Sequence, residues 1–419
     1  MPQNKFIPGQ TYIPVSGKIF DKTEINNAIA AAKDGWWTEG RFSKQFELDF
    51  KAFFNNKIKF ISLVNSGSSA NLLAIAALTA KIFGSRSLKP GDEVITTAVA
   101  FPTTINPLIL YGLVPVFIDA EIDSFNIKAS DIESAITKKT KAIMIAHTLG
   151  KPFNVDKILK IAKKYNLWLI EDCCDALGSK YNDRLLGTFA DLATFSFYPA
   201  HQITMGEGGA IITNNSRLHK TIRQFRDWGR DCWCGTGQDN SCKKRFKWQL
   251  GELPFAYDHK YIYSQIGFNL KLTDFQSAIG VAQLKKLPKF IKQRKKNYGS
   301  LFKFFSQYPQ YFKLMKTAAK EDPAWFGFPL LVKKKAPFSR NQLTEYLEIN
   351  KIGTRNVFAG NLLRHPAYIN LKDKIKIHKQ MINADKIMNQ AFWLGVFPGI
   401  DKVRLDYIKK TIQRFLKKL

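Results

Sequence analysis

The sequence predicts an α/β protein, with a large domain on a mostly parallel sheet flanked by helices and a smaller C-terminal α/β domain. Most of the first 290 residues alternate between short apolar runs of strand length and amphipathic runs of helix length. Strands and helices that alternate in this way form parallel sheets whose faces the helices cover. Ligands of such sheets bind at the carboxyl ends of the strands, so polar residues directly after a strand are the candidate site.

Short apolar runs predict the strands, and amphipathic runs predict helices between several of them. The expected strands are Phe60–Val64, Val94–Thr97, Val114–Asp119, Ala142–Ala146, Leu167–Ile170, Ala193–Phe197 and Gly209–Thr213. The expected helices are Ala70–Lys81, Ser130–Thr137, Val155–Tyr165 and a segment that begins after Thr273 and continues past Tyr298. We place the large domain at residues 1–290 and the small domain at residues 291–419.

Composition is that of an ordinary globular protein, with 45% hydrophobic and 13% aromatic residues among 419. No apolar run reaches the roughly 18 residues that a membrane span needs. The N-terminus lacks the apolar stretch of a secretory signal, so we expect a cytoplasmic protein without membrane contact.

The formal net charge of +30 raises the question of nucleic acid. Lysines are scattered along the whole chain, and no zinc-finger or RNP-type signature accompanies them. We therefore expect a solvated basic surface, not nucleic-acid binding, with some attraction for an anionic diphosphate substrate or an acidic protein partner.

Two loops that follow expected strands carry polar residues. In Asn65–Asn71 (NSGSSAN), small residues let backbone N–H groups approach an anion at a helix N-terminus, although a plain Ser-capped helix would have the same sequence. In Leu169–Asp175 (LIEDCCD), a carboxylate at the strand end could hold a protonated heterocyclic nitrogen, although a cap or turn carboxylate is the alternative.

A third motif, Thr194–Gly209 (TFSFYPAHQITMGEGG), follows the first two along the chain. The succession SGSSAN, EDxxxALGS, FSFxP and GEGG resembles the sugar aminotransferases of the fold-type-I pyridoxal phosphate class, the DegT/DnrJ/EryC1/StrS family. The resemblance extends to Gly267–Leu270 and the helix that follows, covers most of residues 20–290 and reaches the C-terminal domain more loosely. It implies a fold-type-I, pyridoxal phosphate-dependent transferase-like fold.

His201 departs from the family pattern. Relatives carry a Lys at this position, which holds the cofactor covalently, and an imidazole cannot form that stable link. It can act as a general base. The family members with a His there are dehydratases that use pyridoxamine phosphate held without a covalent bond, whereas a decayed pseudoenzyme is the alternative.

Five cysteines fall within one stretch, Cys173–Cys242, and an odd number favours metal or redox chemistry over disulfides. The spacing of Cys174, Cys232, Cys234 and Cys242 resembles the C-X57-C-X-C-X7-C pattern of the CDP-4-keto-6-deoxyglucose 3-dehydrases, whose four thiolates hold a 2Fe–2S cluster. Cys173 is one residue off this register, and we expect it to be a buried neighbour. Four cysteines would also suit structural zinc, which spacing alone leaves open.

The resemblance also implies the roles of individual residues. His201 would abstract the C4′ proton of the cofactor, and Asp175 and Tyr198 would line the altered pocket around it. The implied cofactor-binding residues are Asp172 at the pyridine nitrogen, Phe101 on the ring, Gly67, Ser68 and Ser196 at the phosphate, Asn269 reaching the phosphate from the partner subunit of a homodimer, and Phe326 as a further aromatic.

The implied activity is that of an iron–sulfur oxidoreductase, the C3 deoxygenation of CDP-4-keto-6-deoxy-D-glucose in 3,6-dideoxysugar and lipopolysaccharide biosynthesis. A separate NAD(P)H-dependent flavin or iron–sulfur reductase would supply the electrons, because the chain has no dinucleotide-binding G-x-G-x-x-G. A dTDP- or GDP-linked ketosugar substrate, and a pseudoenzyme with structural zinc, stay open as alternatives.

Overall fold

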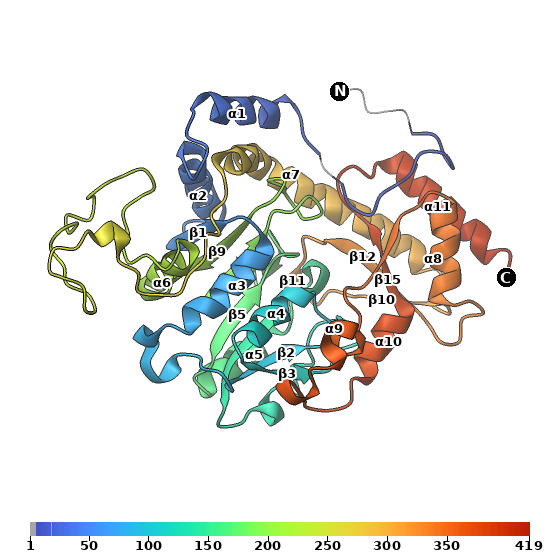
Figure 1. Ribbon diagram of the computed structural model, residues 1–419. Coiled ribbons are helices and arrows are strands. Elements are labelled where there is room, and N and C mark those ends of the chain that lie inside the picture. The colour runs from blue at the N-terminus through green and yellow to red at the C-terminus, as the bar shows by residue number, and fades with distance from the viewer. Residues whose placement is uncertain (1–5, 18) are drawn as a thin grey trace.

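A computed structural model describes residues 6–17 and 19–419, and its largest element is an eight-stranded sheet in the order β1-β9-β8-β5-β4-β2-β3-β14 (Figure 1). These strands are β1 (Phe60–Val64), β2 (Glu93–Thr97), β3 (Val114–Ile118), β4 (Thr140–Ala146), β5 (Trp168–Asp172), β8 (Leu192–Ser196), β9 (Gly209–Thr213) and β14 (Lys376–Ile377).

The sheet is mostly parallel, as expected, with one strand reversed. All pairs from β8 through β14 are parallel, whereas β9 pairs antiparallel with both β1 and β8. The connection from β8 to β9 contains no crossover helix, so the chain turns back beside the strand it has just left. This turn carries His201.

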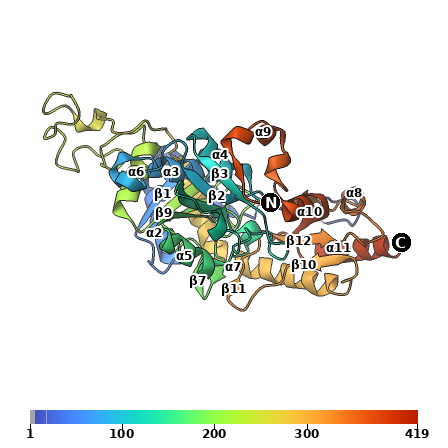
Figure 2. The ribbon, with the colours of Figure 1, turned by 90° about the horizontal axis from the view of Figure 1, so that it is seen from below.

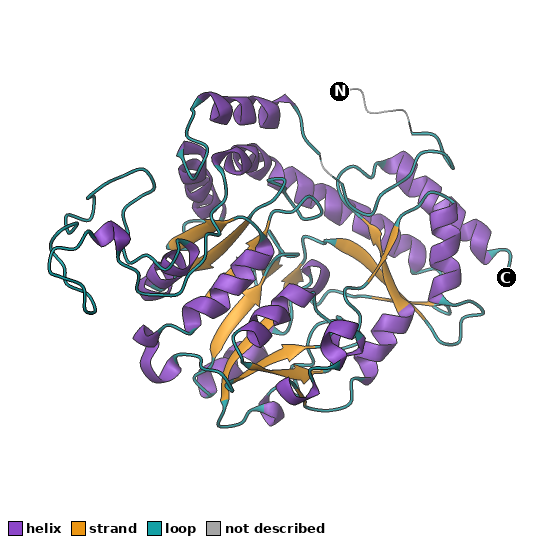
Figure 3. Cartoon of the chain, viewed as in Figure 1, coloured by secondary structure: helices purple, strands orange, loops and turns teal. Residues whose placement is uncertain are grey.

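Successive apolar side chains along each strand point to opposite faces of the sheet, so they pack into two cores, one on each face. Val94 and Ile170 belong to one core, and their neighbours Ile95 and Leu169 belong to the other. Helices cover both faces (Figure 3). The helices on the first face are α3 (Gly67–Leu78), α4 (Pro102–Leu110) and α6 (Ser216–Arg226); those on the second are α2 (Arg41–Phe53), α5 (Val155–Lys164) and the start of α7 (Asp274–Phe305).

The expected helix at Ser130–Thr137 is wrong. Only a short 3-10 turn, η2 (Glu133–Ala135), forms there. The N–H of Thr137 donates to the side-chain oxygen of Thr140, and both threonine hydroxyls donate to the buried Glu93. These side-chain bonds compete with the helical backbone bonds and end the helix after one turn.

A second, four-stranded sheet follows, in the order β10-β12-β15-β13. Its strands are β10 (Phe312–Leu314), β12 (Gly327–Val332), β13 (Thr354–Asn356) and β15 (Ala391–Gly395), and the helices around it include α8 (Arg340–Ile349), α10 (Ile382–Gln390) and α11 (Lys402–Leu416). The division we placed at residue 290 falls inside α7, a single helix of 32 residues that links the two sheets. Strand β14 returns from the C-terminal part to pair with β3 of the large sheet.

The segment between α6 and α7 is a large irregular feature of the fold. We call residues 228–268 the excursion; Figures 1 and 2 both show it extending beyond the body of the molecule. Its regular structure is limited to a 3-10 turn, η4 (His259–Tyr261). No helix in the described part of the chain is both long and apolar enough to cross a membrane.

An aromatic cluster joins α2 to the centre of the large sheet, so its loss should cost stability. The Phe50 ring is fully buried and lies 5.4 Å from Phe195 and 5.5 Å from Phe46, between ring centroids. We expect Phe50→Ala to lower the free energy of unfolding by about 3–5 kcal/mol, because it leaves a cavity that the surrounding rings cannot fill. Thermal and urea denaturation measure this loss. Leu48→Ala, on the exposed side of the same helix, should change little, and an equal loss in both variants would contradict the assignment.

Candidate active site

A cavity of about 610 Å³ opens at the carboxyl ends of β5 and β8. The N-terminus of α3 forms one wall, and residues in and next to the small sheet close the other side, among them Arg355 of β13, Trp393 of β15 and Phe358, which follows β13. Of the predicted site residues, the cavity contacts Gly67, Ser68, Phe101, Asp172, Cys174, Asp175, Ser196, Tyr198, His201 and Phe326.

Asp172 is the last residue of β5, and hydrogen bonds to both of its carboxylate oxygens hold its side chain in place. Oδ2 accepts hydrogen bonds from Asn71 Nδ2 at 2.9 Å and Thr104 Oγ1 at 2.7 Å, and Oδ1 accepts one from the N–H of Cys174 at 3.1 Å. Thr194 of β8 in turn donates to Asn71 Oδ1 at 2.6 Å. This network holds a buried carboxylate in one orientation, as a partner for a protonated ring nitrogen must be held.

The N-terminus of α3 provides a close-packed cradle at another wall of the cavity. Ser66 caps the helix, its side chain accepting from the N–H of Ser69. A Cβ on Gly67 would lie 2.5 Å from the Cβ of Ser196, so only glycine lets the helix start approach β8 this closely. Helix N–H groups and the hydroxyls of Ser68 and Ser196 suit a phosphate here.

His201 and Asp175 face each other across the loop after β8. His201 Nδ1 lies 3.5 Å from Asp175 Oδ1 and has no hydrogen-bond partner among the described residues. Burial lowers the pKa of the His201 imidazole to about 3, and the charge of Arg294 adds to that effect. Burial raises the pKa of the Asp175 carboxyl to about 8, and the nearby Asp172 charge raises it further. At neutral pH the imidazole is therefore uncharged, with one ring nitrogen that carries no proton.

Arg294 of α7 supports the His201 loop, although sequence reasoning did not identify it. The residue is 1% exposed, and its guanidinium donates to three backbone carbonyls, those of His201 at 2.8 Å, Phe326 at 3.1 Å and Trp325 at 3.2 Å. It therefore ties the catalytic loop to the start of β12. One arginine among the many lysines of α7 gave no signal in the sequence.

The aromatic candidates lie around the cavity, whereas Asn269 does not reach it within its own chain. Phe101 and Tyr198 are about half exposed and line the opening. The Phe326 ring is buried, with its centroid 5.2 Å from that of His201. Asn269 is exposed at the base of the excursion, where Lys271 Nζ donates to its side chain at 3.0 Å. Its role across a homodimer stays a prediction.

The cysteines separate into three places. Cys232, Cys234 and Cys242 gather in the excursion, with their sulfurs within 4.8 Å of one another. Cys174 is not in that group and lines the active-site cavity instead. Cys173 is fully buried, as expected, with its sulfur near His147 and Glu171.

This fold and cavity define a fold-type-I enzyme of the pyridoxal phosphate-dependent aminotransferase type, with a mixed sheet that carries its polar residues at the strand ends. The chain belongs to the DegT/DnrJ/EryC1/StrS aminotransferase family, whose sequence model matches residues 18–413. The fold class predicted from the sequence is thereby confirmed.

Known proteins resemble the chain over nearly its whole length. It is 50% identical to the lipopolysaccharide biosynthesis protein RfbH of Salmonella typhimurium, covering 98% of this chain and 93% of that protein. It is 46% identical to the dTDP-4-dehydro-2,6-dideoxy-D-glucose 3-dehydratase of Saccharopolyspora spinosa, and the match covers 99% of this chain and 88% of that protein. A solved structure of the E. coli GDP-4-keto-6-deoxy-D-mannose-3-dehydratase with bound hydrated PLP superposes on the chain with a TM-score of 0.84 at 30% identity. The match covers 96% of this chain and 100% of that one.

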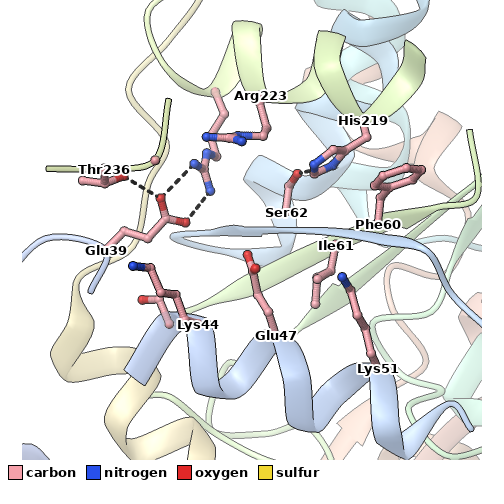
Figure 4. A pocket seen from close by; sticks show the side chains of 13 residues that line it. Glu39, Lys44, Glu47, Lys51, Phe60, Ile61, Ser62, His219, Arg223 and Thr236 are labelled. Carbon is pink, nitrogen blue, oxygen red and sulfur yellow. Dashed lines mark hydrogen bonds and ion pairs between the residues drawn. The ribbon is translucent and has the colours of Figure 1, made fainter. Parts of the chain in front are cut away.

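A second pocket, of about 190 Å³, lies between α2, β1 and α6 (Figure 4). Glu39 accepts hydrogen bonds there from Arg226 and Thr236, and His219 stacks on Phe60 with centroids 4.8 Å apart. Burial raises the pKa of the nearby Glu47 carboxyl to about 7, and the Glu39 charge raises it further. Glu39 is bonded to Arg226 and Thr236, and Ser62 Oγ lies 3.3 Å from His219 Nδ1, which indicates a structural role for these groups.

The raised pKa of Glu47 makes stability depend on pH. Because the folded-state pKa exceeds the usual 4.5, this carboxyl favours folding below about pH 4.5, and that contribution is lost as the pH rises through about 7. We expect Glu47→Gln to raise Tm relative to the unmodified protein more at a pH near 8 than at a pH near 5. Thermal denaturation at both pH values measures the difference. Glu345→Gln, exposed on α8, serves as the control, and a pH-independent difference for Glu47→Gln would contradict the assignment.

Proposed function

We propose that the chain removes the C3 hydroxyl of a nucleotide-linked 4-keto-6-deoxyhexose, with CDP-4-keto-6-deoxy-D-glucose as the first-choice substrate. The product would enter the biosynthesis of a 3,6-dideoxysugar of lipopolysaccharide. Pyridoxamine phosphate would be the resident cofactor, and a 2Fe–2S cluster reduced by a separate NAD(P)H-dependent reductase would supply electrons.

One observation carries the proposal: His201 stands where the cavity of an aminotransferase needs a lysine. No lysine is among the described residues that line the cavity. The amino group that holds pyridoxal phosphate covalently is therefore missing, whereas an uncharged imidazole is present to move a proton. This combination favours dehydration with a non-covalently held amine cofactor over amino transfer.

The residues present fit pyridoxamine phosphate. Asp172 would hold the pyridine nitrogen, the start of α3 with Ser68 and Ser196 would hold the phosphate, and Phe101 would cover one ring face. When bound, the cofactor would supply an amine for the C4 ketone and an electron sink for breaking the C3–oxygen bond.

The other residues would then act on substrate and proton. His201 would take the proton from C4′ of the cofactor. Asp175, which accepts a hydrogen bond from the N–H of Leu149 at 3.3 Å, would provide a polar group beside the imidazole. Arg355 of β13 lines the cavity from the small sheet and is suited to the diphosphate of the substrate. Phe326 and Trp393 would exclude water from the reacting side.

Two nucleotide-linked substrates are candidates. The choice of CDP rests on the cysteine spacing, whereas the 46% identity to a dTDP-ketosugar 3-dehydratase favours a dTDP-linked substrate as the second candidate. Turnover of the CDP-, dTDP- and GDP-linked ketosugars, compared by mass spectrometry of the products, distinguishes them.

Replacing His201 tests the proton transfer. We expect His201→Asn to keep the fold and to reduce dehydration by roughly 10²–10⁴-fold, the usual contribution of a positioned general base. Exchange of the C3 oxygen with labelled water measures dehydration without any need for the reductase. Binding of pyridoxamine phosphate, followed by its absorbance, should be retained as the control. Dehydration at the unmodified rate would show that another residue is the base.

Replacing the cysteines tests the cluster. We expect Cys232→Ser and Cys242→Ser to abolish the red-brown absorbance and the bound iron, because three thiolates do not hold a stable 2Fe–2S centre. Cys173→Ser is the matched control and should keep both, since its sulfur lies in the core beside His147. Zinc in place of iron in the anaerobically purified protein would contradict the cluster and favour the structural-zinc alternative.

A further inference from the structure

The excursion holds three of the four thiolates that the proposed cluster requires. The sulfurs of Cys232, Cys234 and Cys242 lie within 4.8 Å of one another. The buried His259 flanks them, with Nδ1 3.9 Å from Cys242 Sγ. A 2Fe–2S centre of this type takes four thiolates, so the excursion of a single chain is one thiolate short.

The fourth predicted ligand, Cys174, is fixed in a different part of the molecule. Its N–H donates to Asp172 Oδ1 directly after β5, and its sulfur lies 3.0 Å from the position that a Cβ on Gly67 would occupy. Cys174 therefore belongs to the rigid wall of the active-site cavity, and its thiol lines that cavity.

The two ends of the excursion are held together at a narrow base. The N–H of Trp228 donates to the carbonyl of Phe268 at 2.5 Å, and Gly229 packs so tightly on Gly267 that an added Cβ on Gly267 would lie 2.1 Å from Gly229 N. From this narrow base the segment extends beyond the body in both views (Figures 1 and 2).

The excursion also exposes an apolar surface that a single chain leaves uncovered. Ile266 is 93% exposed and Phe255 is 70% exposed, and Phe246 is more than half exposed. Exposed aromatic side chains also surround the cavity opening, where Phe101 and Tyr198 are about half exposed. Large apolar side chains exposed on a protruding segment indicate an interaction site. Because the fourth predicted ligand, Cys174, is a residue of this same sequence, a second copy of the chain is the partner that would complete the set.

We propose that the 2Fe–2S centre is built between two copies of the chain, with the three excursion thiolates from one copy and Cys174 from the other. This inference rests on the proposed function, which requires the cluster. In a two-fold symmetric dimer each excursion would reach the cavity of the other copy, so the dimer would hold two centres. The cluster would then lie at the cavity where its electrons are used.

Mixed dimers test this arrangement directly. A Cys174→Ser chain and a Cys232→Ser chain are co-expressed with different affinity tags, and the mixed dimer is purified through both tags and reconstituted anaerobically with iron and sulfide. In the mixed dimer, the intact excursion of the first chain meets the intact Cys174 of the second. We expect about half the iron and half the visible absorbance of the unmodified dimer, because one of two symmetric sites is complete.

Three controls fix the interpretation. Homodimers of either variant should hold no cluster, and a mixed dimer of Cys232→Ser with Cys242→Ser should also hold none, since both excursions are broken. A mixed dimer of Cys174→Ser with Cys232→Ser that stays free of iron would overturn the shared site, as would a monomer that holds a full centre. Iron retained by the Cys174→Ser homodimer would overturn it too and would point to His259. An unmodified protein that binds no iron would instead overturn the cluster in the proposed function itself.

Discussion

The fixed carboxylate of Asp172 is the interaction on which the rest of the site depends. Asn71 of α3 and Thr104 of α4 both donate to it, and Thr194 of β8 completes the chain of bonds through Asn71. Four elements that lie far apart in the sequence are thereby locked around one buried charge. An unpaired buried carboxylate would be costly, so these donors and the packing that positions them are needed together.

A second constraint lies on the opposite side of the catalytic loop. Arg294 donates to the carbonyls of His201 and Phe326, which joins the large sheet, the long helix α7 and the small sheet at the active site. The guanidinium keeps His201 in place through its backbone and, by its charge, favours the neutral imidazole.

The sequence predicted most of the sheet, because buried strands of a parallel sheet are continuous apolar runs bounded by turns. Phe60–Val64 and Gly209–Thr213 were predicted with their observed limits. The helix predicted at Ser130–Thr137 does not form because Thr137 and the nearby Thr140 bond to Glu93, which lies 44 and 47 positions away and is not revealed by any local pattern. The antiparallel direction of β9 likewise follows from how its connection folds, and not from its own residues.

For the site, the sequence by itself determined the residue types: a histidine in place of a lysine, a carboxylate at a strand end, and cysteines at a spacing suited to a cluster. Order along the chain and the resemblance to a known family suffice for these, because neither depends on knowing which distant residues are in contact. Only the tertiary structure decided which of them meet. It brought His201 to Asp175 and placed Arg294 behind the loop, and it separated Cys174 from the three excursion thiolates. Contacts between distant residues depend on packing and on the path of the excursion, which spacing does not encode.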